Sequence, residues 1–250
     1  MIEEEIALSV ILPAYNEAKL IDSRLERLVH HLSHRTDGWE ILVIDDGSTD
    51  DTAARVAAAA LKEPRLRLVS LQLNQGKGAA IARGMAEARG AVLATTDADL
   101  SYALTDLDQV VAAIAAGADM ATGNRRHPES RINLPFGLFP YLVRRWLAGV
   151  AFRLLVRSLF GLDVSDTQCG LKAYSRGSAS AVFPRMTTRR FLADIEVFLV
   201  ARGLGLRVAE VPVHLRYLSG TTSVRMLGGL PATLRDLARI KAAEMSGRYE

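Results

Sequence analysis

Ala91-Val92-Leu93-Ala94-Thr95-Thr96-Asp97-Ala98-Asp99 is an apolar run, typical of a buried β-strand, that ends in two carboxylates. If the extended backbone continued through Asp99, Asp97 and Asp99 would face the same side, because alternate residues of a strand do so. Two carboxylates that close are unfavourable unless a cation or a proton separates them. Since Mg²⁺ binds through one or two carboxylates plus phosphate oxygens, the stretch predicts a metal–diphosphate site. The alternative at this point is a solvated turn after a strand.

Strand-like and helix-like patterns alternate around this stretch. Apolar runs rich in β-branched residues predict strands at 6–12, 39–44, 66–71, 91–96 and 119–122, the first of them stopped by Pro13. Apolar residues at helical spacing predict helices at about 16–33, 49–61, 79–89 and 104–116, the second capped by Ser48 or Thr49. The alternation predicts an α/β fold with a parallel sheet and helices on both faces.

Four polar clusters directly follow predicted strands, at 13–17, 45–48, 74–78 and 97–99. Right-handed crossovers place these strand ends at one edge of the sheet, where such folds bind ligands. Their convergence favours a ligand site at Asp97 and Asp99 over a solvated turn.

The bulk composition is that of an ordinary globular protein. The 250 residues suffice for one large α/β domain or two small ones, and 49% are hydrophobic against 24% charged. The single cysteine, Cys169, excludes an intramolecular disulfide and fits a reducing compartment. The acidic start at 1–5 shows no secretory signal, and no uninterrupted apolar run reaches about 18 residues. We therefore expect a cytoplasmic protein without a spanning helix.

The second half of the chain is strongly basic. Between 124 and 157, Glu129 is the single acid against arginines at 125, 126, 131, 144, 145, 153 and 157. Such a field predicts an anionic partner. The helical pattern at 142–159 mixes bulky apolar residues with arginines, which favours a membrane-interface segment at 134–160, peripheral on the cytoplasmic face. The alternative is a helix hairpin or dimer contact. Nucleic acid is disfavoured, because the segment lacks a solvated, polar character.

The remainder of the chain predicts further α/β elements. A polar loop at 163–172 precedes strand-like residues near 173–174, and a helix at 192–202 is followed by a strand at 206–211. Glu196 in that helix suggests either a partner for an arginine or a solvated face, and Arg189-Arg190 suggests a solvated pair. An amphipathic helix at about 231–245 has an apolar face of Leu234, Leu237, Ile240 and Ala243. We therefore divide the chain into a domain at 1–229 and a C-terminal helix and tail at 230–250.

Several motifs together carry a family resemblance. VILPAYNEA at 10–18, EILVIDDGSTDDT at 40–52, NQGKGAAIARG at 74–84 and TTDADLS at 95–101 resemble an inverting GT-A glycosyltransferase of the polyprenyl- and dolichyl-phosphate sugar synthase family. GNRRHPES at 123–130, SDTQCGLKAYSR at 165–176 and the segment 191–213 are similar to its dolichyl-phosphate glucosyltransferase branch. The resemblance implies a GT-A, Rossmann-like sheet with interfacial helices.

The resemblance also implies roles for individual residues. It implies a divalent ion, Mg²⁺ or Mn²⁺, held by Asp99 directly and by Asp97, which also lies near the ribose. Lys77 would be a cation on the diphosphate side, although a turn that caps a helix also explains it. The other nucleotide-binding residues would be Pro13, Ala14, Tyr15 and Glu17 in the pocket wall, and Asp46 or Asp45 at the base or ribose. Relatives often continue the motif differently from Leu100-Ser101-Tyr102, so no metal contact is assigned to Ser101.

The acceptor implied by the resemblance is a polyprenyl or dolichyl phosphate. A phosphate monoester has a second pKa of about 6 and is already largely ionised at neutral pH, so it has little need of a strong general base. It needs arginines that hold a dianion, and the candidates are Arg125, Arg126, Arg131 and Arg145. Asp166 would orient the acceptor or act as a base. Asp99, Asp166, Arg125 and Arg131 are thus the expected catalytic residues.

The sequence therefore predicts metal-dependent, inverting transfer of a hexose, with glucose favoured over mannose, to a polyprenyl phosphate at a membrane. The donor would be a UDP-sugar, with a GDP-sugar as the alternative. Two other functions stay open: a soluble glycosyltransferase with a non-lipid acceptor, and a non-catalytic nucleotide-binding subunit. A membrane-protein partner or a homo-oligomer also stays open.

Overall fold

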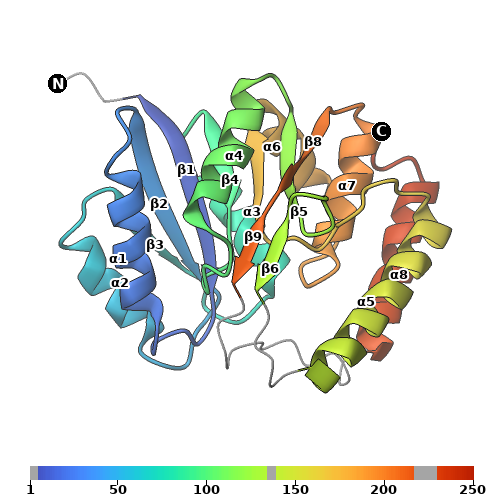
Figure 1. Cartoon of the computed structure of the whole chain (residues 1–250), viewed down its shortest axis with the longest axis horizontal. Helices are drawn as coiled ribbons and strands as arrows, with labels where there is room; N and C mark the ends of the chain where they lie inside the picture. The colour runs from blue at the N-terminus through green and yellow to red at the C-terminus, as the bar shows by residue number, and fades with distance from the viewer. Residues whose placement is uncertain (1–4, 134–138, 217–229) are drawn as a thin grey trace.

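The structure is a computed structural model that describes residues 5–133, 139–216 and 230–250, with the side chains of 139–148 and 230–232 left out. Figure 1 shows a twisted central sheet covered by helices on both faces. The elements of the first half are β1 (Ile6–Ala14), α1 (Ile21–Leu32), β2 (Gly38–Asp45), α2 (Thr52–Ala60), β3 (Leu66–Ser70), α3 (Lys77–Glu87), β4 (Val92–Thr95), α4 (Leu104–Ala115) and β5 (Met120–Asn124). The alternation predicted for this half is confirmed.

The second half is less regular. Its elements are β6 (Arg131–Asn133), α5 (Phe139–Phe160), β7 (Lys172–Ser175), α6 (Arg176–Val182), the 3₁₀ helix η2 (Phe183–Arg185), α7 (Ala193–Gly203), β8 (Val208–Pro212), β9 (His214–Arg216) and α8 (Leu230–Met245). The predictions missed β6, β9 and α6. No helix in the described ranges has both the length and the apolar character needed to cross a bilayer.

The main sheet has seven strands in the order β3-β2-β1-β4-β7-β5-β8. Strands β1 to β4 pair in parallel, as do β5 and β8, which confirms the mostly parallel sheet. The exception is β7, which runs antiparallel between β4 and β5. A small parallel pair, β6 and β9, lies beside the main sheet (Figure 1).

Each face of the sheet has its own apolar core, because successive strand residues point to opposite sides. Ile11 belongs to the cluster that contains residues of α3, α5, α6, α7 and α8. Its neighbours Val10 and Leu12 belong to the cluster with α1, α2 and α4. This packing holds the carboxyl ends of the parallel strands at one edge.

Proline does not stop the first strand. Pro13 pairs with Ile44 of β2, whereas pairing with β4 ends at Ile11 and Thr95. Ile11 O accepts the amide of Thr96, so the backbone groups of Ile11, and of Pro13 two residues later, face β4. At Pro13, where the N–H is missing, β4 has already ended. The proline therefore costs no ladder bond, and the prediction that it ends the strand was wrong.

Two helix starts also differ from prediction. Helix α1 begins at Ile21 rather than near Asn16, because Glu17 O accepts the amides of Leu20 and Ile21 in a preceding turn. The residue that caps α2 is Asp51, which makes no side-chain cap bond, so the predicted caps were wrong. Ser48 and Thr49 instead bond to the first loop, as described below.

Helix α8 lies beside α5 (Figure 1). Its Leu237, Ile240 and Ala243 belong to the core cluster of α3 and α7, as the predicted apolar face requires. Leu234 is 54% exposed, so its assignment to that face was wrong. Lys241 Nζ donates to Leu159 O at 2.9 Å and ties the two helices together.

Candidate active site

The four polar clusters lie together at the carboxyl edge of the parallel strands, and hydrogen bonds connect them. The first two are joined by Asn16, whose amide donates to Ser48 Oγ at 3.0 Å and whose Oδ1 accepts the Thr49 amide at 2.8 Å. Asn16 adopts a positive φ of 56°, a conformation that asparagine tolerates better than most residues. The convergence predicted from the strand ends is therefore present.

Asp46 joins the second cluster to the third. Its carboxylate is buried and accepts the amides of Gln75 and Gly76, each at 2.8 Å. Gly76 has a φ of 101°, and a Cβ there would lie 2.8 Å from Arg189 O. The neighbouring Asp45 is also buried and accepts the Ser48 amide at 3.2 Å. Both carboxylates thus shape the loops, and contact of either one with a base or ribose stays a prediction.

Lys77 joins the third cluster to the fourth. Its Nζ lies 2.6 Å from Asp97 Oδ1, and the two side chains are 32% and 35% exposed. Burial by itself would raise the pKa of Asp97, but Lys77, followed by Lys172 and Arg125, holds it below its ordinary value. Burial likewise opposes the charge on Lys77, yet Asp97 raises the pKa of that ammonium. Both groups are therefore ionised at neutral pH.

The backbone does not stay extended through the acidic motif. Strand β4 ends at Thr95, and the Leu100 amide donates to Asp97 O in a turn. Asp99 Oδ1 accepts the Ser101 amide at 3.0 Å. The expectation that the backbone stays extended through Asp99, with both carboxylates on one side of a strand, was therefore wrong. Both carboxylates lie in a turn instead.

A buried ion pair behind Asp97 was not predicted. Lys172 Nζ lies 2.6 Å from Asp194 Oδ1 and donates to Cys169 O, also at 2.6 Å. Its side chain is 2% exposed, so the charge acts in a poorly solvated environment. A lysine is rarely fully buried without a partner. That rule could have marked Lys172 within its apolar strand, but the partner is 22 residues away.

The loop before β7 also packs directly against Asp97. A Cβ on Gly170 would collide with the carboxylate of Asp97. The Gly170 amide lies 3.4 Å from the hydroxyl of Tyr102, which is buried. The neighbouring Cys169 is buried, and burial raises the pKa of its thiol, so this cysteine is packed rather than reactive.

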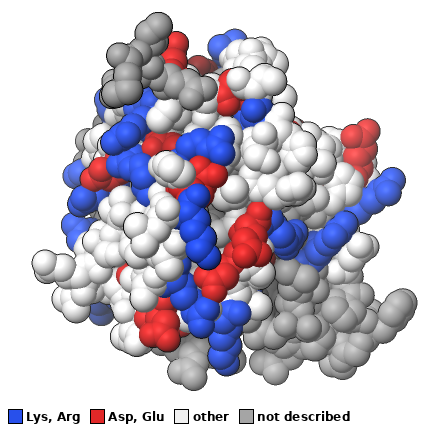
Figure 2. All heavy atoms as spheres, turned by 90° about the vertical axis from the view of Figure 1, so that its left-hand side faces the viewer, with Lys and Arg blue, Asp and Glu red and all other residues white. Residues whose placement is uncertain are grey.

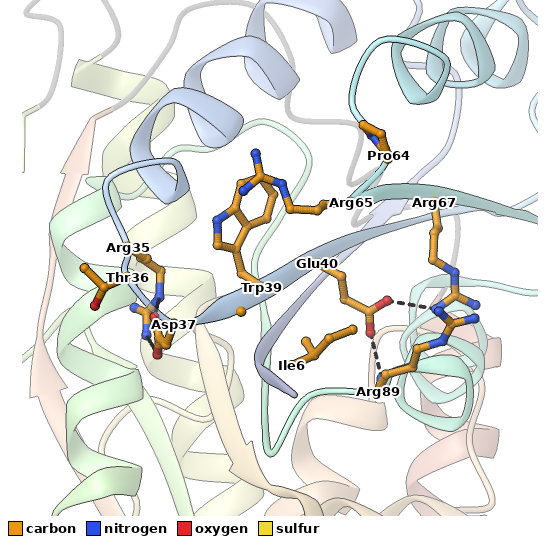
Figure 3. Close-up of a pocket in the computed structure, with 11 residues that line it drawn as sticks. Ile6, Arg35, Thr36, Asp37, Trp39, Glu40, Pro64, Arg65, Arg67 and Arg89 are labelled. Atoms are coloured by element: carbon orange, nitrogen blue, oxygen red, sulfur yellow. Dashed lines mark hydrogen bonds and ion pairs between the residues drawn. The ribbon is translucent and has the colours of Figure 1, made fainter. Parts of the chain in front are cut away.

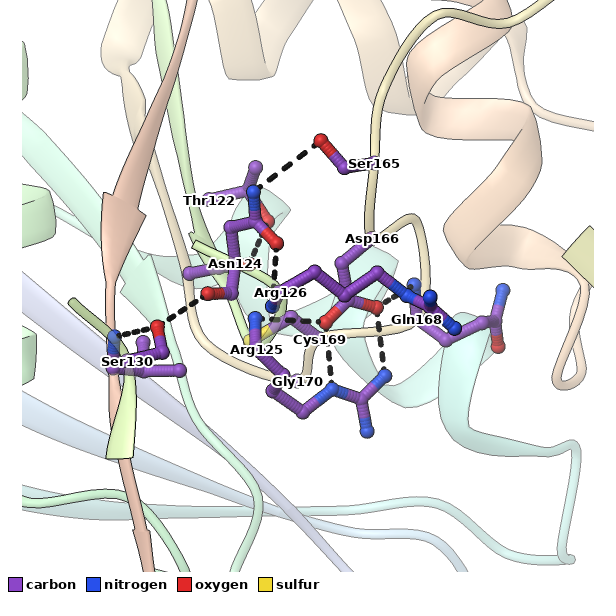
Figure 4. A network of polar contacts seen from close by, with 12 residues as sticks. Thr122, Asn124, Arg125, Arg126, Ser130, Ser165, Asp166, Gln168, Cys169 and Gly170 are labelled. Carbon is purple, nitrogen blue, oxygen red and sulfur yellow. Dashed lines mark hydrogen bonds and ion pairs between the residues drawn. The ribbon is translucent and has the colours of Figure 1, made fainter. Parts of the chain in front are cut away.

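Asp166 and Arg125 form a bidentate pair (Figure 4). Arg125 Nε and Nη2 donate to the two carboxylate oxygens at 2.6 and 2.7 Å, and its amide donates at 3.1 Å. Asp166 is buried, and although burial opposes its ionisation, these bonds hold the pKa of its carboxyl below the ordinary value. Both residues lie in the site, but Asp166 is already engaged by an arginine. It therefore positions Arg125 and is poorly suited to be a base.

The other predicted acceptor arginines are scattered. Arg126 is exposed, and after burial the largest cause that lowers its pKa is the nearby charge of Arg153 on α5. Arg131 is exposed on β6. The side chain of Arg145 lies outside the described residues. Arg126 and Arg153 thus gather positive charge beside the Arg125–Asp166 pair.

The predicted nucleotide wall lies at the same edge. Pro13 and Ala14 end β1, and Tyr15 directly after them is 44% exposed. Glu17 Oε2 lies 2.6 Å from Nη1 of the buried Arg24, so this carboxylate has a structural partner. Contact of these residues with a nucleotide stays a prediction.

Glu196 is not solvated, and among the residues that the structure describes it has no arginine partner, so both interpretations were wrong. It is completely buried, and its oxygens accept the amides and hydroxyls of Thr187 and Thr188 at 2.6 to 2.7 Å. It also accepts the Tyr249 hydroxyl at 2.8 Å. Because the loop at 187–188 satisfies it, the carboxylate can remain inside the core.

A cavity of about 250 Å³ lies at the opposite, amino-terminal edge of the sheet (Figure 3). Three of its four arginines have a close carboxylate partner: Arg35 pairs with Asp37 at 2.7 Å, Arg65 with Glu63 at 2.8 Å and Arg67 with Glu40 at 2.8 Å. On the face with α1 and α2, acidic and basic side chains also intermingle (Figure 2). The candidate site is therefore at the carboxyl edge.

The donor set limits what kind of metal site this edge can form. No three His, Cys, Asp or Glu side chains cluster as a metal site within the part of the chain that the structure describes. Two carboxylates, Asp97 and Asp99, remain. They fit a hard divalent ion that completes its shell with phosphate oxygens and water, and do not fit a metal held by protein ligands alone.

Comparisons with known proteins agree with this arrangement. The family model described as "Glycosyl transferase family 2" matches residues 9–183 of this chain. A dolichyl-phosphate beta-glucosyltransferase of Trichomonas vaginalis is 31% identical, over 94% of this chain and 71% of the relative. The Saccharomyces cerevisiae protein with that activity is 28% identical, over 99% of this chain and 78% of the relative.

Solved structures show the same fold. Glucosyl-3-phosphoglycerate synthase from Mycobacterium tuberculosis, in complex with UDP, superposes with a TM-score of 0.65 at 22% identity, over 96% of this chain and 80% of that protein. The matched family region contains all four loop clusters and the Arg125–Asp166 pair. The chain therefore belongs to glycosyl transferase family 2 and is a glycosyltransferase.

Proposed function

We propose that this glycosyltransferase transfers a hexose, glucose in the first instance, from a nucleoside-diphosphate sugar to a polyprenyl phosphate at a membrane surface. The observation that carries the proposal is the connected set of four loops at the ligand edge, in which Lys77 contacts Asp97 and the second carboxylate, Asp99, follows two residues later. The relatives named above support glucose as the sugar and a dolichyl-type phosphate as the acceptor.

Donor binding combines carboxylates with a lysine. Asp97 and Asp99 would hold Mg²⁺ or Mn²⁺ together with the donor diphosphate. When bound, such an ion neutralises the charge that develops on the leaving diphosphate. Lys77 lies against Asp97 and can turn from this carboxylate to a diphosphate oxygen. The exposed ring of Tyr15 is suited to contact the base, and a UDP-sugar is the proposed donor. Mycobacterial glucosyl-3-phosphoglycerate synthase, a structural neighbour, was crystallised with Mn²⁺ and UDP.

Acceptor binding falls to the arginines beside the Arg125–Asp166 pair. Arg126 and Arg153 repel each other, and a phosphate between them would relieve that repulsion. Arg125, held in place by Asp166, adds a third guanidinium whose remaining nitrogen can face the acceptor. A phosphate monoester is mostly ionised above its second pKa of about 6. It can therefore attack the sugar carbon without losing a proton to the enzyme.

Membrane contact is proposed for α5. Leu154, Leu155 and Leu159 are exposed on this helix, at 58%, 41% and 37%. Arg153 and Arg157 lie among them. Exposed leucines with interspersed arginines suit a helix in the lipid interface, where apolar side chains meet acyl chains and guanidinium groups meet phosphates.

The test is a transfer assay with purified protein. UDP-glucose, UDP-galactose or GDP-mannose is supplied with a detergent-solubilised polyprenyl phosphate and Mg²⁺ or Mn²⁺, and the glycolipid is quantified. We expect product with UDP-glucose, loss of product with a chelator, and loss in Asp99→Asn. Glu26→Gln, on the exposed side of α1, is the matched control and should remain active.

Two outcomes would replace the proposal. Transfer to a water-soluble acceptor but not to the lipid would favour a soluble glycosyltransferase. If no sugar nucleotide is consumed under any condition while nucleotide still binds, the chain is a nucleotide-binding subunit and catalysis lies elsewhere.

A further inference from the structure

A second, basic cavity lies beside the donor edge. It has a volume of about 280 Å³ and is formed by the loop before α3, the loop at 187–190 and helix α8. Its charged lining comprises Arg189, Arg190 and Arg239, against Asp236 as the one acid that lines it among the described residues. None of these residues has a role in the donor or acceptor site proposed above.

The positive charge in this cavity is only partly compensated. Arg239 lies 3.6 Å from Asp236, a long ion pair within α8. Arg189 Nη1 donates to the neutral side chain of Gln75 at 3.3 Å. The guanidinium of Arg190 is exposed and has no partner among the residues that the structure describes. An excess of two positive charges therefore faces the cavity.

The loop that presents these arginines is held from both sides. On the core side, the buried Glu196 accepts four bonds from Thr187 and Thr188. On the other side, Arg189 O accepts the Ala79 amide at 2.9 Å. The cavity thus exists before any ligand arrives, which lowers the conformational cost of binding one.

The loop and the helix that line the cavity also carry exposed apolar side chains. Phe191, next to Arg190 in sequence, is 38% exposed and lies 6.3 Å from the ring of Phe152 on α5. Leu234 on α8, two residues before the cavity residue Asp236, is 54% exposed. Guanidinium groups on the same loop and helix as exposed phenylalanine and leucine match a lipid interface better than an aqueous protein contact.

We propose that this cavity binds the phosphate group of an anionic phospholipid in the membrane surface, and so fixes α8 and the 187–190 loop against the bilayer. Planar guanidinium groups bind phosphate oxygens in pairs, which gives the cavity its chemical preference. The proposal extends the membrane-bound enzyme proposed above. It can be tested without donor or acceptor, so the two can fail separately.

The experiment measures binding of the full chain to phosphatidylcholine vesicles with and without phosphatidylglycerol. The cavity variant is Arg190→Gln with Arg239→Gln. The control is Arg27→Gln with Lys62→Gln, which removes the same charge from exposed positions of α1 and of the turn after α2. Each basic residue near an anionic surface adds to the free energy of membrane binding, and the loss of two should weaken vesicle binding by about 30-fold. Circular dichroism checks that both variants are folded.

A parallel arm measures inorganic phosphate binding to the same proteins by calorimetry. Selective loss of phosphatidylglycerol binding in the cavity variant supports the phospholipid assignment. If the cavity variant loses phosphate binding while its vesicle binding is unchanged, the cavity is a phosphate site for a soluble ligand. That result would overturn the assignment of a phospholipid as the ligand. Equal weakening in both variants, or no binding by the unaltered protein, would overturn the site. Transfer to a detergent-solubilised acceptor, measured alongside, reports on the proposed function independently.

Discussion

Replacing Lys77 by methionine should make the protein bind Mn²⁺ more tightly in the absence of nucleotide. The Lys77 ammonium lies 2.6 Å from Asp97 Oδ1, so a metal ion that approaches this carboxylate must displace it. Methionine keeps the length of the side chain but removes the charge. Asp97 should stay ionised, because Lys172 and Arg125 also hold its pKa low.

The size of the effect follows from the exposure of the pair. The two side chains are about one-third exposed, at 32% and 35%, so solvent screens their attraction. An ion pair of this kind contributes about 1 kcal/mol. The metal affinity of Lys77→Met should therefore rise about fivefold, since about 1.4 kcal/mol corresponds to a factor of ten.

Nucleotide should reverse the advantage of the variant. In the unaltered protein the displaced ammonium can contact the donor diphosphate, so UDP and Mn²⁺ should strengthen each other's binding. Lys77→Met lacks that contact, and the gain in Mn²⁺ affinity on adding UDP should be smaller.

The assay is titration of Mn²⁺ followed by electron paramagnetic resonance, with and without UDP. Lys77→Arg retains the charge and should bind Mn²⁺ like the unaltered protein, and Lys62→Met controls for loss of a distant charge. Unchanged or weaker Mn²⁺ binding by Lys77→Met without nucleotide would refute the competition. Absence of Mn²⁺ binding in every protein would instead refute the metal assignment.

Three further predictions concern stability and reactivity. Asp166→Ala leaves Arg125 without its partner and should lower the free energy of unfolding by about 3 kcal/mol in urea titrations. The pKa of Asp166 is depressed in the folded state, so the stabilisation by its carboxylate is present above the ordinary carboxyl range and is lost as pH falls through the folded pKa. The difference in unfolding free energy between the unaltered protein and a second variant, Asp166→Asn, should therefore shrink in acid. Glu196→Gln should destabilise the protein by about 3 kcal/mol through weaker bonds to its loop, whereas Glu26→Gln should have almost no effect; equal unfolding midpoints would contradict the buried network. The Cys169 thiol should resist a thiol reagent in the folded protein and react fully in urea, since burial raises its pKa, and rapid native labelling would show that it is accessible.

Much of the first half of the fold could be predicted because its signals are local. The strand-length apolar runs and the helical spacing each lie within one element, and β1 to β5 appear where these patterns place them. Parallel strands must then end at one edge. That topology places the loops of Asn16, Ser48, Lys77 and Asp97 at one edge.

The second half was harder because its partners are distant in sequence. Strand β7 fits between β4 and β5 only once both are in place. Strands β6 and β9 of the small sheet have three residues each, which is too short to show a hydrophobic period. The depth of α7 in the core likewise made Glu196 a buried residue bonded to a loop, where the sequence suggested an arginine partner or a solvated face.

The sequence by itself determined the chemistry at the sheet edge: two carboxylates and a lysine at strand ends, and arginines further along the chain. Only the tertiary structure decided which of these charges are already paired. Asp166 meets Arg125 across 41 residues, and Lys77 occupies Asp97 across a crossover. Residue type and spacing cannot specify such pairs, because a charge inside a fold is compensated by whichever opposite charge the packing brings within a few ångströms.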